Sequence, residues 1–339
     1  MVVYSVFITL VLILYSQYCF SKDKIVKYIS SNILFLIVLL FLGLRKGIGI
    51  DYSHYEHAFQ AIKIGEKMYL SEPIYYIFNK VFSLINYESM IFFVAFLSVY
   101  YFSISLNTNN RILYIPLAIF LLYIPSFTLM RQVLAIVHVI YGFSVDDDKH
   151  RFKWLIIASL IHKSMWILTI LYFICKYVKI SWHFVLIFCF VFMIIFTFSN
   201  MGLGLLEIIL KYTPYAYYLN TIHLLTKRHV GILTILQLGY ELSFFIYNKS
   251  SLKNRNNSFV NLLFMFMICS EIVGLRILIF ATRVTFIFYP AFFIEVQKKQ
   301  KRYKLFEYSG LFLAFLVAIG KLINTGHWDN VVPYSSLLF

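Results

Sequence analysis

A cluster of charged residues and glycines follows the second long apolar run of the sequence. Arg45 ends that run, and Gly47, Gly49 and Asp51 follow it closely. Arginine carries a permanent charge and a planar set of donors that matches phosphate oxygens. Glycine lets the backbone approach a ligand, and a carboxylate can orient or deprotonate a hydroxyl. In so apolar a chain, this cluster predicts a site for a charged, lipid-linked substrate. The alternative is a solvated loop in which the glycines only make a turn.

Two further arginines stand apart from the other basic residues. Arg131 lies between two apolar runs, and Arg283 begins a strongly aromatic one. Together with Arg45, they would suit a diphosphate at the membrane surface if their helices brought them together. The alternative is that each side chain extends from a helix end to the lipid headgroups.

His162 is the best candidate for a general base. It lies in the middle of an apolar run and is followed by Lys163 and Ser164. A neutral imidazole accepts a proton near neutral pH, and a nearby lysine favours the neutral form. The alternative is a packing histidine. Asp51 is the second candidate base, although it could instead pair with Arg45 or orient a sugar hydroxyl.

Tyrosines accompany these charged residues at two places. Tyr52 and Tyr55 follow Asp51, and Tyr215 and Tyr218 lie in the segment 200–229. Tyrosine offers an apolar face and a hydroxyl, which suits sugar rings, but it is also enriched at membrane interfaces. Glu72, directly before Pro73, is a further carboxylate.

The composition requires a membrane environment for these residues. The chain has 339 residues, of which 61% are hydrophobic and 13% charged, whereas a soluble domain carries roughly 25% charged residues. We therefore predict an all-α protein with a single integral-membrane domain, 1–339, and about 10–12 transmembrane helices of about 20 residues each. The apolar runs fall near 3–20, 28–44, 73–86, 88–106, 112–128, 129–145, 154–174, 182–199, 230–248, 259–279, 283–297 and 306–323.

Two of these runs are expected to be irregular. Segment 73–86 is too short and polar for an ordinary crossing, so it is predicted to be re-entrant or interfacial. Segment 154–174 is predicted to enter the membrane and return, with a break near His162. The loops then alternate so that more than half of the Lys and Arg lie on the cytoplasmic side. Segments 45–72 and 200–229 become outer loops, and the candidate site residues share the outer side.

Several classes of site are not indicated. The net charge of +15 is scattered in short clusters between apolar runs, which argues against a nucleic-acid-binding face. The four cysteines show no metal-ligand or redox spacing, so neither a metal site nor a disulfide is expected. No cofactor is predicted.

Taken in order, these motifs resemble the EpsG-like family of Wzy-type polysaccharide polymerases. The resemblance rests on motifs spread over about residues 45 to 334. They are Arg45-x-x-x-Gly49-x-Asp51-Tyr52-x-x-Tyr55, Glu72-Pro73, Met130-Arg131-Gln132, His162-Lys163-Ser164, Arg283 and Val332-Pro333-Tyr334.

The resemblance implies an enzyme of the bacterial inner membrane with an architecture similar to C-type glycosyltransferases. It would join oligosaccharide repeat units carried on undecaprenyl diphosphate into O-antigen, capsule or exopolysaccharide. Arg45, Arg131, Arg283 and Gly49 would bind the diphosphate, His162 and Asp51 would act in catalysis, and Tyr52, Tyr55, Tyr215 and Tyr218 would bind sugars. The implied partners are a flippase and a Wzz-type chain-length regulator.

Three other functions use similar residues. A flippase would handle the same substrate, but we find no internal repeat of the kind that transporters commonly show. An O-antigen ligase would instead transfer finished chains to lipid A-core. A membrane acyltransferase would use a buried histidine and a thioester-linked donor. Three arginines suited to a diphosphate argue against this function.

Overall fold

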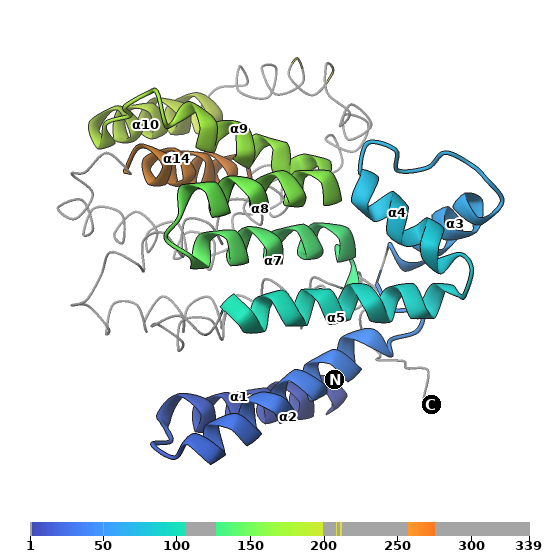
Figure 1. Cartoon of the computed structure of the whole chain (residues 1–339). Helices are drawn as coiled ribbons and strands as arrows, with labels where there is room; N and C mark the ends of the chain where they lie inside the picture. The colour runs from blue at the N-terminus through green and yellow to red at the C-terminus, as the bar shows by residue number, and fades with distance from the viewer. Residues whose placement is uncertain are drawn as a thin grey trace. The chain divides into compact units, whose positions relative to one another are not determined.

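The computed structural model describes residues 2–49, 51–105, 127–198 and 257–274, together with positions 208 and 211. Its regular structure there is helical throughout, which confirms the all-α prediction (Figure 1). The total number of crossings and the C-type glycosyltransferase architecture stay predictions. The elements are α1 Val2–Phe20, α2 Lys24–Gly43, α3 Tyr52–Lys63, α4 Pro73–Phe82, α5 Tyr87–Ser105, α7 Met130–Ser144, α8 Asp148–Ile161, η4 Lys163–Met165, α9 Trp166–Ile174, α10 Trp182–Phe198 and α14 Asn257–Gly274.

Two of the described helices are long and apolar enough to cross a membrane. They are α2, with a mean hydropathy of 2.3, and α5, with 1.5. On α2, all of the exposed aliphatic side chains except Val26 recur every three or four residues, which places them on one face of the helix. Such a stripe would be unstable against water but stable against lipid. The exposed stripe is formed by Ile25, Ile29, Ile33, Leu36 and Leu40.

The chain divides into two compact units, Met1–Thr169 with Glu307–Phe339, and Ile170–Phe306. In the first unit, α1 packs on α2, α2 on α5, α5 on α7, and α7 on α8 (Figure 1). Aromatic rings fill the space near α1 and α2, where Phe7 stacks on Phe41 at 3.8 Å and Phe41 contacts Phe127 at 5.6 Å. These helices form the frame on which the candidate site is built.

In the described part of the second unit, α10 and α14 pack against each other. Polar groups of α14 bind the backbone that leads into α10. Ser258 Oγ accepts a hydrogen bond from the Ile180 amide at 2.9 Å, and Asn261 Nδ2 donates to the Ile180 carbonyl at 2.8 Å. None of the predicted site residues lies on these two helices.

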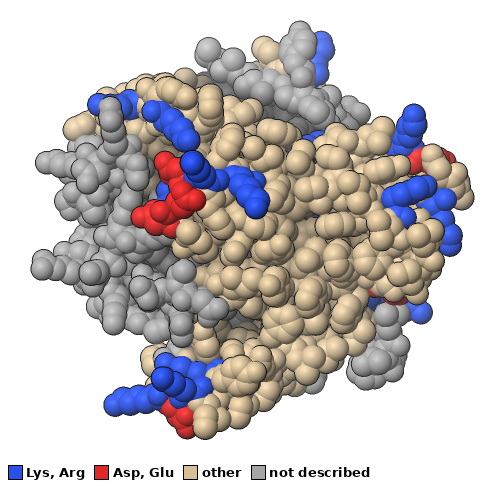
Figure 2. Space-filling view, viewed as in Figure 1, with Lys and Arg blue, Asp and Glu red and all other residues tan. Residues whose placement is uncertain are grey.

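The two ends of the first unit carry the connections between its helices and much of its charge (Figures 1 and 2). The α1–α2 and α7–α8 connections lie at one end, whereas α3, α4, the end of α2 and the start of α7 lie at the other (Figure 1). Lys, Arg, Asp and Glu side chains gather at these ends, and the surface between them is formed by other residue types (Figure 2). At the first end, Arg151 forms ion pairs with Asp146 and Asp148. The predicted topology requires these two sets of connections to lie at opposite ends. Which end faces the cytoplasm stays a prediction.

The run 154–174 is broken at the residues where the sequence predicted a break. Helix α8 ends at Ile161, and His162 adopts an extended conformation with φ −144° and ψ 119°. A short 3-10 turn, η4, then leads into α9. Helix α4 has 10 residues, which at 1.5 Å each is about half of a bilayer core. The re-entrant path of both segments stays a prediction.

Candidate functional site

The site is organised around Glu72, the residue that precedes α4. Pro73 occupies the first turn of that helix, where a missing N–H is harmless, so the chain turns into α4 directly after Glu72. Only 1% of the Glu72 side chain is exposed. A carboxylate at this depth is destabilising unless hydrogen bonds or opposite charges compensate for its lost hydration.

Both carboxylate oxygens of Glu72 have partners from distant parts of the chain. Oε1 lies 2.6 Å from His162 Nδ1 and accepts a hydrogen bond from the Lys163 backbone amide at 3.3 Å. Oε2 forms an ion pair with Nη1 of Arg131. The break between α8 and α9 is therefore useful here, because it frees the Lys163 amide and directs it at the carboxylate. One carboxylate joins a potential base to a permanent cation.

These partners decide the charge state of Glu72. Burial raises the pKa of the carboxyl, but the hydrogen bond with His162 and the positive charge of Arg131 act in the other direction. Their combined effect is larger, and the pKa lies below its ordinary value of 4.5. Glu72 is therefore an anion at neutral pH and accepts hydrogen bonds at both oxygens.

The Arg131 guanidinium is enclosed by three tyrosine rings. Its central carbon lies 4.1 Å from the ring centre of Tyr69, 5.1 Å from that of Tyr55 and 5.6 Å from that of Tyr75. Aromatic faces attract a cation, and the attraction is stronger where water is excluded. Arg131 Nε is buried and has no hydrogen-bond partner among the described residues. The group is thus held firmly while one of its donors is unused.

Tyr69 has an unusual backbone. Its φ is 60°, the left-handed region that residues other than glycine seldom adopt. This conformation brings the ring over Arg131. Burial raises the pKa of the Tyr69 phenol to about 12, so it stays neutral at physiological pH. Tyr69 therefore contributes a ring face to the site and no charge.

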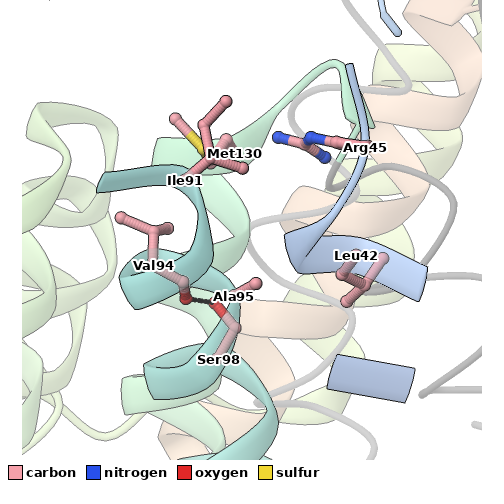
Figure 3. Close-up of a pocket in the computed structure, with 7 residues that line it drawn as sticks. All are labelled: Leu42, Arg45, Ile91, Val94, Ala95, Ser98 and Met130. Atoms are coloured by element: carbon pink, nitrogen blue, oxygen red, sulfur yellow. Dashed lines mark hydrogen bonds between the residues drawn. The ribbon is translucent and has the colours of Figure 1, made fainter. Parts of the chain in front are cut away.

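Arg45 lies near this group and is almost fully buried, with 2% of its surface exposed. Its guanidinium carbon lies 5.2 Å from the centre of the Phe127 ring. It also borders a small pocket in which it points from the end of α2 toward Met130 (Figure 3). Tyr55 and Tyr75 lie close enough to influence both Arg45 and Arg131 electrostatically. The pocket is otherwise lined by Leu42, Ile91, Val94, Ala95 and Ser98.

The segment that contains Gly49 is packed tightly against residues 127–128. Gly49 has a φ of +98°, and a Cβ at this position would lie 2.1 Å from the Phe127 carbonyl oxygen. Nearby, the Tyr55 hydroxyl donates a hydrogen bond to the Thr128 carbonyl at 3.2 Å. The glycine is thus required for a backbone-to-backbone contact. Its predicted contact with phosphate stays a prediction.

Residues 28–336 match the EpsG family. The chain belongs to the EpsG family. The matched range covers most of the sequence and includes all of the predicted site residues, so the predicted family is confirmed. No curated protein and no solved structure matches the chain.

Of the site residues predicted for this EpsG-family chain, the structure brings together Arg131, His162 and Tyr55. Arg45 and Gly49 lie beside them, joined through Phe127. Tyr52 is buried against Tyr87, at 5.4 Å between ring centres, and its carbonyl accepts a hydrogen bond from the Tyr87 hydroxyl. Its predicted role in sugar binding stays a prediction. Arg283, Tyr215 and Tyr218 lie outside the described residues.

Among the described residues, the Asp51 side chain forms no hydrogen bond or ion pair with Glu72 or His162, although its charge acts on the nearby Tyr69 phenol. It precedes α3 and is half-buried, and its side chain makes no capping hydrogen bond to that helix. Its carbonyl accepts a hydrogen bond from the Tyr55 amide at 2.9 Å. Among the described residues of this EpsG-family protein, no group of acidic, histidine and cysteine side chains is suited to hold a metal ion.

Glu72 receives too little weight from the sequence alone, and nothing in the sequence assigns a role to Tyr69 or Tyr75. The sequence does mark Glu72, because this carboxylate directly precedes Pro73 at the start of a mostly apolar segment. No comparable signal marks the two tyrosines, because 27 tyrosines are spread along the chain. In this EpsG-family chain, their role depends on the fold that places their rings around Arg131.

Proposed function

We propose that this EpsG-family chain is a polysaccharide polymerase, an integral-membrane glycosyltransferase with a C-type-like architecture. Its substrates would be oligosaccharide repeat units carried on undecaprenyl diphosphate at the outer face of the bacterial inner membrane. The observation that carries the proposal is the meeting of His162 and Arg131 at one buried carboxylate, Glu72. A proton acceptor and a cation are the two groups that transfer of a glycosyl unit from a diphosphate requires.

The reaction forms one bond and breaks another at the anomeric carbon of the donor. The acceptor hydroxyl oxygen bonds to that carbon while its proton passes to His162. The bond from the carbon to the diphosphate oxygen breaks, and its electron pair leaves with the diphosphate. The leaving group needs neutralisation of charge more than it needs a proton, and a guanidinium provides this. Arg131, whose side chain is 16% exposed, and Arg45, which borders a small pocket, are the described candidates.

The remaining assignments extend from these residues. Arg283 would complete the diphosphate site, and Tyr215 and Tyr218 would contact the sugars. A flippase would deliver each lipid-linked unit to the outer leaflet, and a Wzz-type regulator would limit chain length. O-antigen, capsule and exopolysaccharide differ in their sugars, but each is built with the same diphosphate leaving group. The assigned diphosphate site would therefore suit any of the three products.

A deletion strain tests the function directly. We expect loss of the gene to leave surface glycan with a single repeat unit and no ladder on a gel. The wild-type gene should restore the ladder, and His162→Ala should not. His57→Ala is a matched control, because His57 is exposed on α3.

Other outcomes point to the rival functions. Complete loss of exported repeat units would indicate a flippase. Polymer that forms but stays on its lipid carrier would indicate a ligase. A ladder of normal length from the deletion strain would exclude any required role in polymerisation.

A further inference from the structure

We propose that Glu72 is the positioning residue of the site, holding His162 in the tautomer that can accept a proton and holding Arg131 beside it. This inference rests on the proposed function, because it assumes that His162 receives a proton from the acceptor hydroxyl. It concerns a carboxylate that would not itself touch the substrate. Three observations support it.

The first is the geometry of the hydrogen bond between Glu72 and His162. The two atoms, Oε1 and Nδ1, lie 2.6 Å apart. An ionised carboxylate can only accept, so Nδ1 must carry the hydrogen of a neutral imidazole. The lone pair then lies on Nε2, at the opposite edge of the ring. The His162 side chain is 16% exposed, so the ring is not fully enclosed, and the proposal requires the substrate to reach it at Nε2.

The second observation is the use of the other oxygen. Oε2 is paired with Arg131, while Oε1 also accepts the Lys163 amide. The positive charge of Arg131 favours the ionised carboxylate, so Glu72 does not compete with His162 for the proton. Once His162 is protonated, the same carboxylate stabilises the imidazolium. One side chain thus serves the base before and after the proton moves.

The third observation is how Glu72 itself is fixed. It stands at the start of α4, and α4 packs on both α5 and α8. The Tyr76 amide donates to the Glu72 carbonyl at 2.9 Å, which fixes the backbone at this point. The carboxylate is therefore set by packed helices, as the precise orientation of a base requires.

Glu72→Gln is the central test, with Glu72→Asp as a second variant that keeps the charge. Glu66→Gln is the matched control, because Glu66 is exposed in the segment before α4. The rate of polymerisation would be measured with purified protein and lipid-linked repeat units across a range of pH. We expect Glu72→Gln to lower kcat by about 10- to 100-fold, the loss typical for hydrogen-bond partners of metal-bound histidines, with KM changed by less than about threefold.

The pH profile separates positioning from a role in structure alone. The charged groups that face His162 are Glu72, Arg131 and Lys163. Removing the one negative charge among these disfavours the imidazolium. The acidic limb of the kcat/KM profile should therefore move to lower pH in Glu72→Gln but stay in place in Glu72→Asp. A Glu72→Gln protein with the wild-type rate and an unmoved acidic limb would overturn the inference.

The tautomer can be observed without any reaction. In protein labelled with nitrogen-15 at histidine, the His162 resonances are those absent from His162→Ala. We expect a protonated Nδ1 and an unprotonated Nε2 in the wild type near neutral pH. The opposite tautomer would overturn the inference, even if Glu72→Gln failed to fold. A wild-type protein with the expected tautomer but no polymerisation would instead count against the proposed function alone.

Discussion

Tyr69 adopts a left-handed backbone conformation and places its ring 4.1 Å from the guanidinium carbon of Arg131. Such a conformation costs of order 1–3 kcal/mol in a residue with a side chain, and it persists only where the surrounding structure compensates for it. Here the compensation comes from contact with a desolvated cation and with the Tyr75 ring, 5.6 Å away. The strain is thus located at the candidate site.

Two substitutions at Tyr69 should differ in their effect on stability. The hydroxyl is buried and has no hydrogen-bond partner among the described residues, so Tyr69→Phe should unfold at the wild-type temperature or above it. Tyr69→Ala removes the ring and should lose about 1–2 kcal/mol from the cation–π contact alone. Thermal unfolding in detergent measures both. Equal losses in the two variants would mean that the hydroxyl has an important partner.

Arg131 should be replaceable neither by a small residue nor by lysine. Arg131→Ala leaves the buried Glu72 without its ion pair, and breaking such a pair costs about 3–5 kcal/mol. Arg131→Lys keeps the charge but loses the planar group that lies between the tyrosine rings.

We therefore expect Arg131→Lys to be intermediate in thermal unfolding and to form no glycan ladder. Full activity of Arg131→Lys would show that a point charge is sufficient, against the assigned role of the guanidinium.

Gly49 and Gly47 form a matched pair for testing the packed turn. Both have positive φ, but a Cβ on Gly49 would meet the Phe127 carbonyl oxygen at 2.1 Å, whereas a Cβ on Gly47 would meet nothing within 4 Å. We expect Gly47→Ala to cost about 1 kcal/mol for its φ alone. Gly49→Ala should cost clearly more, because backbone must also move. Similar unfolding temperatures would contradict the close contact between Gly49 and Phe127.

Acid should remove the stability that Glu72 contributes. The folded-state pKa of its carboxyl lies below the ordinary value of 4.5, so the ionised form is favoured by folding. This contribution is fully present above 4.5 and is lost as the pH falls through the folded-state pKa. The difference in unfolding temperature between wild type and Glu72→Gln should therefore narrow below pH 4.5. A difference that widened as the pH fell would contradict the ion pair.

Much of this site could be predicted from the sequence, because single polar residues in apolar runs are conspicuous. His162 and Arg131 were found in this way, as was the break in the run 154–174. The central role of Glu72 was not found, since its partners are 59 and 90 residues away in the chain. The spacing of residues in the sequence predicts contacts within one helix, but not contacts between distant helices. Only the packing of α4 on α8 shows which carboxylate reaches His162.

Gly49 shows a second limit of the same kind. The sequence predicts that glycine here lets the backbone approach a ligand, and this contact with a ligand stays a prediction. It gives no sign of the protein group that packs against Gly49. In the structure, that group is the Phe127 carbonyl, from a segment whose position depends on the packing of α2, α5 and α7.

The two candidate bases can be separated by comparing His162→Ala with Asp51→Asn. His162 is held by Glu72 at 2.6 Å, whereas the Asp51 side chain makes no capping hydrogen bond and is half-buried. A general base contributes typically 10²–10⁴-fold, so His162→Ala should lose at least about 100-fold in kcat. Asp51→Asn keeps the size of the side chain and should lose less than about tenfold, because it removes at most one contact to a sugar hydroxyl. Initial rates on lipid-linked repeat units measure both. The reverse order of losses would transfer the role of base to Asp51 and leave His162 as a packing residue.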